Sequence, residues 1–386
     1  MFGRQEGVER ELRAAAPHEL MAAVRALLVE RAGALDAALL LADYGRTVLQ
    51  PVTELPRTEG ALPIADDPWG TAFSRQIPVV AGMDGDTVVH APVTVRGDRL
   101  GVLAVSFGKP DVSRELVADL ADLATALGHE LLIADRETDL FQQARRRRRL
   151  TLAAEMQWQL LPGTGCAREE FALGGHLEPA YAVGGDNFDW CADADQLVVT
   201  VTDGMGQGVD ASLVTGLAVN AMRNARRAGL DVVGQATLAD QAVFGQYGGV
   251  AHAATLLLRF DLTTGRVSAV DAGSPRVYRH RGGRVEQIEL TAQMPLGMAE
   301  DTPYEEQSFL VEPGDRLVLV SSGVHAARAD DGTEFGRGAL HDGLRGAATS
   351  APYDTARAVV GSLFDHIGGG ELDSDAAVVV LDWSGG

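Results

Sequence analysis

The stretch TVTDGMGQGVDASL, Thr200–Leu213, decides how the second half of the chain is interpreted. The apolar run Leu197–Val201 that leads into it is typical of a buried strand, and the small residues after Gly208 are typical of a helix start. Between them lie one carboxylate, Asp203, and a loop that is almost free of side chains. Such a loop is either an ordinary Asp-Gly turn or a place where the backbone approaches a small charged group.

Two more carboxylates follow a pair of glycines nearby. Asp186 comes directly after Gly184-Gly185, and Asp189 lies three residues further on. Mg²⁺ and Mn²⁺ prefer carboxylate and carbonyl oxygens as ligands, and the glycine that follows Asp203 lets the Gly204 carbonyl turn toward a metal. The spacing fits one wall of a divalent metal site, and it also fits a plain turn.

Length and charge limit the possible classes of protein. The 386 residues, 46% of them hydrophobic, are enough for two or three domains with separate cores. The formal net charge is −21, and most of it lies after residue 150, where 32 acidic residues face 15 basic ones. This charge excludes nucleic acid and anionic membrane as expected partners, and it suits a cation or a basic protein segment.

Cysteine usage and hydropathy point to a soluble, cytoplasmic protein. Cys166 and Cys191 fit no metal or redox spacing and cannot form a disulfide framework. No apolar run reaches the length of a membrane span, and no signal-peptide pattern occurs at the N-terminus. The only lysine is Lys109, which is typical of a protein from a GC-rich bacterial genome.

The N-terminal residues 1–111 read as an α+β domain with an antiparallel sheet. A helix is expected over residues 9–31, followed by two hairpins in LDAALLLADYGRTVLQPV and VVHAPVTVRGDRLGVLAVSFG. Residues 112–161 predict a long helix that ends at Pro162 and links this domain to the next. Its leucine stripe, Leu116 to Leu131, either packs on its own domain or forms a parallel coiled coil. The run Arg145–Arg149 is interpreted as a solvated helix face.

Residues 162–386 alternate strand patterns with helix patterns. Strand patterns occur in QLVVTVTDG, AATLLLRFDLTTGRVSAVDAG, RLVLVSSG and AAVVVLDW, and helix patterns in DASLVTGLAVNAMRNARRAG and APYDTARAVVGSLFDHIGG. Paired strands with separate helices predict antiparallel sheets covered by helices, an α+β sandwich.

The C-terminal region resembles the SpoIIE/RsbU-type branch of the protein phosphatase 2C superfamily. The matching stretches follow the family order: MQWQLLP, EPAYAVGGDNFDW, VTDGMGQGVDASL, VDAGSPRVYRHRGG, MPLGM, DRLVLVSSGVHAARADDGTEFG and SDAAVVVL. The N-terminal domain resembles a GAF sensor, chiefly in DPWGTAFSRQIPVV and HAPVTVRGDRLGVLAV. These resemblances imply a GAF-like α/β sensor, a linker helix and a phosphatase 2C-like αββα sandwich.

The phosphatase resemblance implies a catalytic centre with two Mg²⁺ or Mn²⁺ ions, which activate a water that attacks the phosphate. By position, Asp203 would bridge the metals, Gly204 would offer its carbonyl, and Asp186 would be the second acidic residue of the same wall. This chain departs from the family at two metal-ligand aspartates, which are Ser322 and Ser374 here.

Other residues of these motifs also bear on whether the expected metal site is complete. Asp373 and Asp375 flank position 374 and are possible substitutes as metal ligands, although a one-residue slip in a strand turns the side chain to the other face. The family sequence Ala-Gly-His is Ala272-Gly273-Ser274 here.

The resulting function hypothesis is a sensor-controlled regulator with a phosphatase fold and with weak or absent hydrolysis. Its implied partner is a phosphoprotein, an anti-sigma-factor antagonist by resemblance. The alternative is a fully active, Mg²⁺- or Mn²⁺-dependent phosphoserine/phosphothreonine protein phosphatase. A homodimer is expected through the N-terminal domain and the helix over 112–160.

Overall fold

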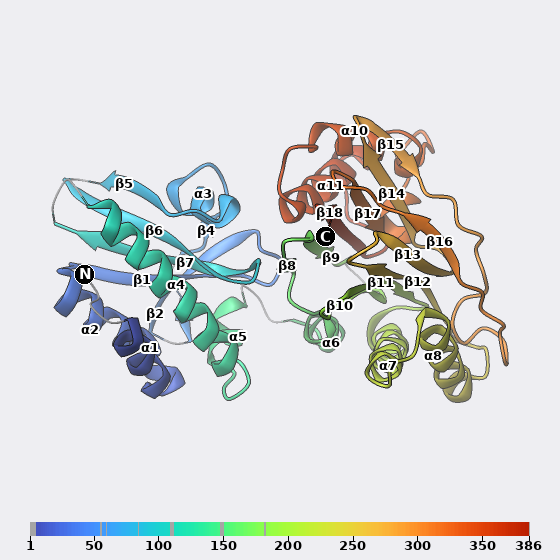
Figure 1. Ribbon diagram of the computed structural model, residues 1–386, viewed down its shortest axis with the longest axis horizontal. Helices are drawn as coiled ribbons and strands as arrows, with labels where there is room; N and C mark the ends of the chain where they lie inside the picture. Colours follow the sequence, from blue (N-terminus) through green and yellow to red (C-terminus); the bar gives the residue numbers. More distant parts are fainter. Residues whose placement is uncertain are drawn as a thin grey trace. The chain divides into compact units, whose positions relative to one another are not determined.

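The computed structural model describes residues 5–54, 56–58, 60–83, 85–108, 112–146, 150–180 and 183–385. The chain divides into two compact units, Met1–Arg149 and Leu150–Gly386, each of which has its own sheets and core (Figure 1). Among the described residues, no helix is both long and apolar enough to cross a lipid bilayer.

The first unit is one antiparallel sheet with helices packed on it. The strand order is β3-β2-β1-β7-β6-β5, with β4 paired to β2. The elements are α1 Gln5–Ala14, α2 Leu20–Ala32, β1 Asp36–Ala42, β2 Val48–Glu54, β3 Arg57–Thr58, β4 Leu62–Pro63, α3 Pro68–Arg75, β5 Val79–Met83, β6 Asp86–Val95, β7 Asp98–Phe107, α4 Arg114–Ala134 and α5 Leu140–Arg145.

Both predicted hairpins are present in this sheet. The β6–β7 turn places Arg96 and Gly97 at positive φ, 51° and 93°, the backbone twist that matches a tight two-residue hairpin. In the β1–β2 turn, the Asp43 carboxylate accepts bonds from the Thr47 and Val48 amides at 2.8 and 3.0 Å. These local contacts explain why the hairpins could be read from the sequence.

The single helix predicted over 112–161 is instead three helices: α4, α5 and α6 Leu152–Leu160. Thr151 caps α6, because its Oγ1 accepts from the Ala154 amide at 3.2 Å, and α5 ends at Arg145 with an extended Arg146. Of the arginine run, residues 147–149 lie outside the described residues.

The leucine stripe of α4 packs on its own domain, the first of the two interpretations. Leu116, Leu120, Leu123, Leu127 and Leu131 are buried in one core cluster with strand residues such as Val93 and Leu103. These side chains are therefore not available for a coiled coil.

The second unit is a sandwich of two antiparallel sheets. One sheet has the order β10-β11-β12-β13-β16 and the other β15-β14-β17-β18-β9-β8. The strands are β8 Gly165–Ala167, β9 Phe171–Glu178, β10 Asp186–Ala192, β11 Gln196–Gly204, β12 Ala253–Asp261, β13 Arg266–Ala272, β14 Arg276–Arg281, β15 Arg284–Gln287, β16 Gln307–Leu310, β17 Arg316–Val320 and β18 Ala376–Trp383.

Helices cover both outer faces of this sandwich. The alternating side chains of β11 and β12 show why: Val199 and Leu258 face the core between the sheets, whereas Leu257 faces α7 and α8. The helices are α7 Gly208–Arg227, α8 Val232–Tyr247, α9 Ser322–His325, α10 Ala339–Gly346 and α11 Pro352–His366. Figure 1 shows α7 and α8 on one side and α10 and α11 on the other, which is the predicted α+β sandwich.

Candidate functional site

Two strands of the five-stranded sheet bring Asp186 and Asp203 together. They are register partners at the start of β10 and near the end of β11, so their side chains leave the sheet on the same face. Asp186 is 3% exposed, and Asp203 is half-buried. The structure thus places the two sequence-predicted acidic residues side by side.

Glycines are needed next to this pair because the backbone is crowded. A Cβ on Gly204 would fall inside the van der Waals envelope of Thr215 Oγ1, and one on Gly185 would meet the Gly204 carbonyl. Thr215 Oγ1 in turn donates to the Gly185 carbonyl at 2.6 Å. Gly185 and Gly204 therefore allow β10, β11 and α7 to come into close backbone contact.

The opposite wall of the site is made of serine hydroxyls. Ser322 Oγ donates to Asp203 Oδ2, and Ser274 Oγ donates to the same oxygen at 3.4 Å. His325 lies next to them, with its Nε2 2.8 Å from the Ser274 carbonyl oxygen. Burial lowers the pKa of His325, so a neutral ring is favoured there.

Burial raises the pKa of the Asp186 carboxyl well above its usual range, and the neighbouring carboxylates of Asp203 and Asp375 raise it further. Hydrogen bonds from the Ser321 side chain and the Ala377 amide act in the opposite direction. A negative charge at Asp186 is therefore costly for the folded protein.

We expect Asp186→Asn to be more stable than the wild type at neutral pH, by a few degrees in thermal unfolding. A carboxyl whose pKa is raised by folding binds its proton more tightly in the folded state, so its ionised form lowers stability above the unfolded pKa of about 3.9. The difference from the wild type should shrink as the pH falls toward that value. Melts across this range measure it, with exposed Asp193→Asn as the control; an Asp186→Asn variant that is less stable at neutral pH would contradict the expectation.

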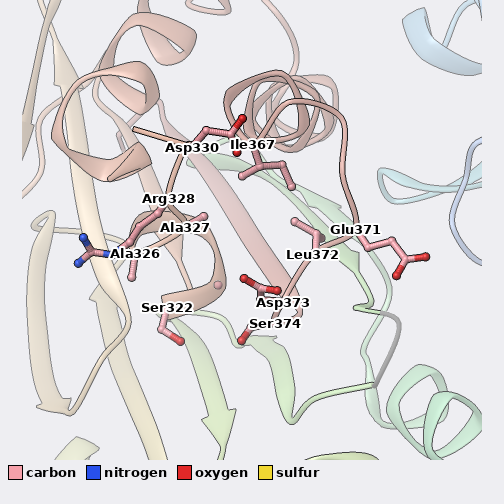
Figure 2. Close-up of a pocket in the computed structure, with 11 residues that line it drawn as sticks. Ser322, Ala326, Ala327, Arg328, Asp330, Ile367, Glu371, Leu372, Asp373 and Ser374 are labelled. Carbon is pink, nitrogen blue, oxygen red and sulfur yellow. The ribbon is translucent and has the colours of Figure 1, made fainter. Parts of the chain in front are cut away.

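Position 374 and its neighbours lie partly in a pocket. Ser322, Asp373 and Ser374 line a cavity of about 420 Å³ between the segment after β17 and the loop before β18. Figure 2 shows the two serines at the same end of this pocket, with Asp373 next to Ser374 and Arg328 directed away from them. Asp373 is exposed and is the nearest carboxylate to position 374 on the pocket side.

Asp375 points the other way and is tied into the protein interior. It is 1% exposed, and its Oδ1 accepts from the Ala180 amide at 2.8 Å. Its Oδ2 accepts from Gln157 Nε2 of α6 at 2.5 Å, and the same amide group donates to the Asp186 carbonyl. Both oxygens are thus occupied, which favours a structural role for Asp375 over metal binding.

Asp189 also has a role that the sequence did not reveal. It is 3% exposed and pairs with Arg223 and Arg226 of α7 at 2.7 and 3.2 Å. Its side chain faces α7, on the opposite face of β10 from Asp186, as expected for an odd separation along a strand. Asp189 therefore holds α7 against the sheet.

These residues fit one divalent cation at most. Asp186 and Asp203 are two neighbouring carboxylates, but Ser322 and Ser374 leave the opposite wall without charge, and a neutral hydroxyl is a poor ligand for Mg²⁺. Among the described residues, no group of three or more His, Cys, Asp or Glu side chains is arranged to hold a metal. The two-metal centre implied by the sequence resemblance does not fit this arrangement.

Comparisons with known proteins agree on the second unit. The family described as Stage II sporulation protein E (SpoIIE) matches residues 193–384. Protein IcfG of Synechocystis sp. (strain ATCC 27184 / PCC 6803 / Kazusa) is 21% identical over 255 residues, which cover 59% of this chain and 40% of that protein. The chain therefore spans less than half the length of this curated relative.

Two solved structures have the same fold. The SiaA-PP2C domain of Pseudomonas aeruginosa matches with a TM-score of 0.51 and 23% identity, over 60% of this chain and 94% of that one. The PP2C phosphatase domain of SpoIIE from Bacillus subtilis, with a fragment of its regulatory domain, matches with a TM-score of 0.50 and 18% identity, over 57% of this chain and 66% of that one. The second unit thus has the fold of these PP2C domains, and residues 193–384 within it match the SpoIIE family model.

Proposed function

We propose that this chain is a sensor-controlled regulator of the SpoIIE/RsbU type that binds a phosphoprotein and hydrolyses it weakly or not at all. One observation carries the proposal: the Ser322 hydroxyl donates to Asp203 at a position where the resembled family has a metal-ligand aspartate. Two-metal hydrolysis depends on a cluster of carboxylates that neutralises both ions, and this site has lost two of them. Any Mg²⁺ or Mn²⁺ ion at Asp186, Asp203 and the Gly204 carbonyl would therefore be single and weakly bound, and the fold would not depend on it.

The proposed partner is a phosphorylated anti-sigma-factor antagonist, and the proposed sensor is the first unit as a GAF-like domain. Support for the sensor comes from the antiparallel sheet with α1, α2 and α4 in one core cluster with it. Support for the partner comes from the family resemblance of the second unit alone. No nucleic acid or membrane partner is proposed, given the net charge of −21.

The second candidate is an active, metal-dependent phosphoserine/phosphothreonine phosphatase. The adjacent carboxylates of Asp186 and Asp203 favour it, because a single bound ion could still polarise a phosphate oxygen. Mn²⁺-dependent hydrolysis of p-nitrophenyl phosphate by the full chain separates the two candidates. Turnover that disappears in Asp203→Asn would support the active enzyme; turnover no higher than that of Asp203→Asn would support the regulator.

A homodimer stays a prediction for this protein. The α4 leucines that suggested a coiled coil are buried in the first unit, so any dimer must use other surfaces. Light scattering of the full chain at tens of micromolar measures the oligomeric state directly.

A further inference from the structure

The edge of the sandwich at Asp203 is closed by a hydrogen bond between the two sheets. Asp203 is near the end of β11 in the five-stranded sheet, and Ser322 lies two residues after Val320, the last residue of β17 in the six-stranded sheet. The bond from Ser322 Oγ to Asp203 Oδ2 joins residues 119 positions apart in sequence. A hydroxyl that donates to an ionised carboxylate makes a charge-assisted bond, which is stronger than a neutral one.

The neighbouring serine makes the corresponding link to the other acidic residue. Ser321 is fully buried, and its Oγ accepts from the Ala377 amide at 3.0 Å. The same hydroxyl hydrogen-bonds to the Asp186 carboxyl. A serine hydroxyl can donate one bond and accept others, so Ser321 connects β10 with both β17 and β18.

A third contact fixes the turn between β13 and β14 to this edge. Ser274 Oγ donates to Asp203 Oδ2 at 3.4 Å, while its carbonyl oxygen faces His325 Nε2 at 2.8 Å. Gly323 is also required here, because a Cβ at this position would collide with the Asp375 carbonyl. Three serine side chains from two connections, the β13–β14 turn and the segment after β17, therefore surround the two carboxylates.

We infer that serine hydroxyls, in place of a divalent cation, hold the two sheets together at this edge. The phosphatase-type fold and its acidic edge then form without metal, so the protein can bind its partner at any cation concentration. The inference rests on the proposed function, since a two-metal centre would need Asp203 Oδ2 for an ion. We call the contacts of Ser274, Ser321 and Ser322 with the two carboxylates the serine lock.

The serine lock predicts that an added negative charge at position 322 destabilises this edge in the absence of a cation. Ser322→Asp places a second carboxylate against Asp203, and two like charges at this distance repel each other. In chelator, the Ser322→Asp variant should therefore lose protection from hydrogen exchange at this edge. With Mn²⁺ it should regain that protection. Protection of the wild-type protein should be the same in chelator and in Mn²⁺, because the Ser322 hydroxyl already donates a hydrogen bond to Asp203.

Hydrogen exchange of the full chain, followed by mass spectrometry, tests the lock locally. The reporting peptides cover residues 198–206 and 316–326, and each variant is measured in EDTA and in Mn²⁺. We expect wild-type protection to be equal in the two conditions. Ser322→Ala should exchange about 10- to 100-fold faster in both peptides, as expected for loss of a hydrogen bond to a charged group.

Two variants make the interpretation unambiguous. Ser322→Thr keeps the hydroxyl and should retain most of the protection. Ser374→Ala removes a hydroxyl from the same pocket that does not contact Asp203 in the described structure, and it should behave as wild type. If the wild-type peptides are protected only in Mn²⁺, or if Ser322→Ala exchanges like wild type, the lock is overturned.

The outcome is separable from that of the proposed function. A wild-type protein that hydrolyses p-nitrophenyl phosphate rapidly with Mn²⁺, yet shows equal protection in EDTA, would remove the regulator proposal and keep the lock. A wild-type protein that does not hydrolyse p-nitrophenyl phosphate, and whose edge is protected only in Mn²⁺, would remove the lock and keep the regulator proposal.

Discussion

Replacing Ser322 and Ser374 together by aspartate is expected to tighten Mn²⁺ binding by more than the two single replacements combined. Both serines line the same end of one pocket, so two new carboxylates there would face the same ion (Figure 2). Asp203 and Asp186 alone offer about two negative charges against roughly +4 from two ions, which leaves the second ion poorly held. Residues that share one ligand are expected to be non-additive.

The single variants indicate how much each position contributes. Ser322→Asp alone adds a charge but breaks the bond to Asp203, so its gain in affinity should be small. With both aspartates present we expect at least tenfold tighter binding, about 1.4 kcal/mol, by titration calorimetry of the full chain. Hydrolysis of p-nitrophenyl phosphate should rise in parallel, because the second ion helps position and ionise the attacking water.

Asp203→Asn in the double-variant background is the control and should abolish any activity. The idea fails if the wild type already turns over phosphoprotein at a rate that the double variant does not improve. The protein would then have assembled its site from other ligands, and Asp373, which lines the pocket, would be the first residue to test.

The sequence was most informative where structure is set locally. The strand that leads to Asp203 is a continuous apolar run, because one of its faces packs on the other sheet and the opposite face on helices. The hairpins carry their own turn residues, so these elements could be predicted. The motif order placed Asp186 and Asp203 near each other, and the strand register brings them together.

What the sequence could not show depends on distant contacts. The α4 leucine spacing is the same for a helix packed on a sheet and for a coiled coil, and only the core around Val93 and Leu103 decides between them. The break into three helices depends on short-range caps such as Thr151, which the helical periodicity hid. The role of Gln157 could not be predicted from the sequence, because its hydrogen-bond partner Asp375 lies 218 residues away.

Asp189→Ala is expected to cause the largest loss of stability in the second unit. Removing this carboxylate leaves Arg223 and Arg226, whose side chains are only 19% and 12% exposed, without their counter-charge. Breaking a buried ion pair in this way costs about 3–5 kcal/mol. For a unit of this size, the midpoint of thermal unfolding should fall by roughly 6–20 °C, measured by scanning calorimetry of the full chain.

Loss of the Asp189 ion pairs should also affect the candidate site, because these ion pairs hold α7 in place. This helix follows the glycine loop after Asp203, and Arg223 also donates to the Leu160 carbonyl at the end of α6 at 2.8 Å.

Asp193→Ala, which removes an exposed carboxylate just beyond β10, is the matched control and should change stability by less than about 0.5 kcal/mol. Combining Asp189→Leu with Arg223→Met and Arg226→Met should recover most of the loss, because an apolar cluster of similar volume needs no counter-charge. A triple variant as unstable as Asp189→Ala would show that the ion pairs do more than balance charge, and that their hydrogen-bond geometry positions α7 against β10.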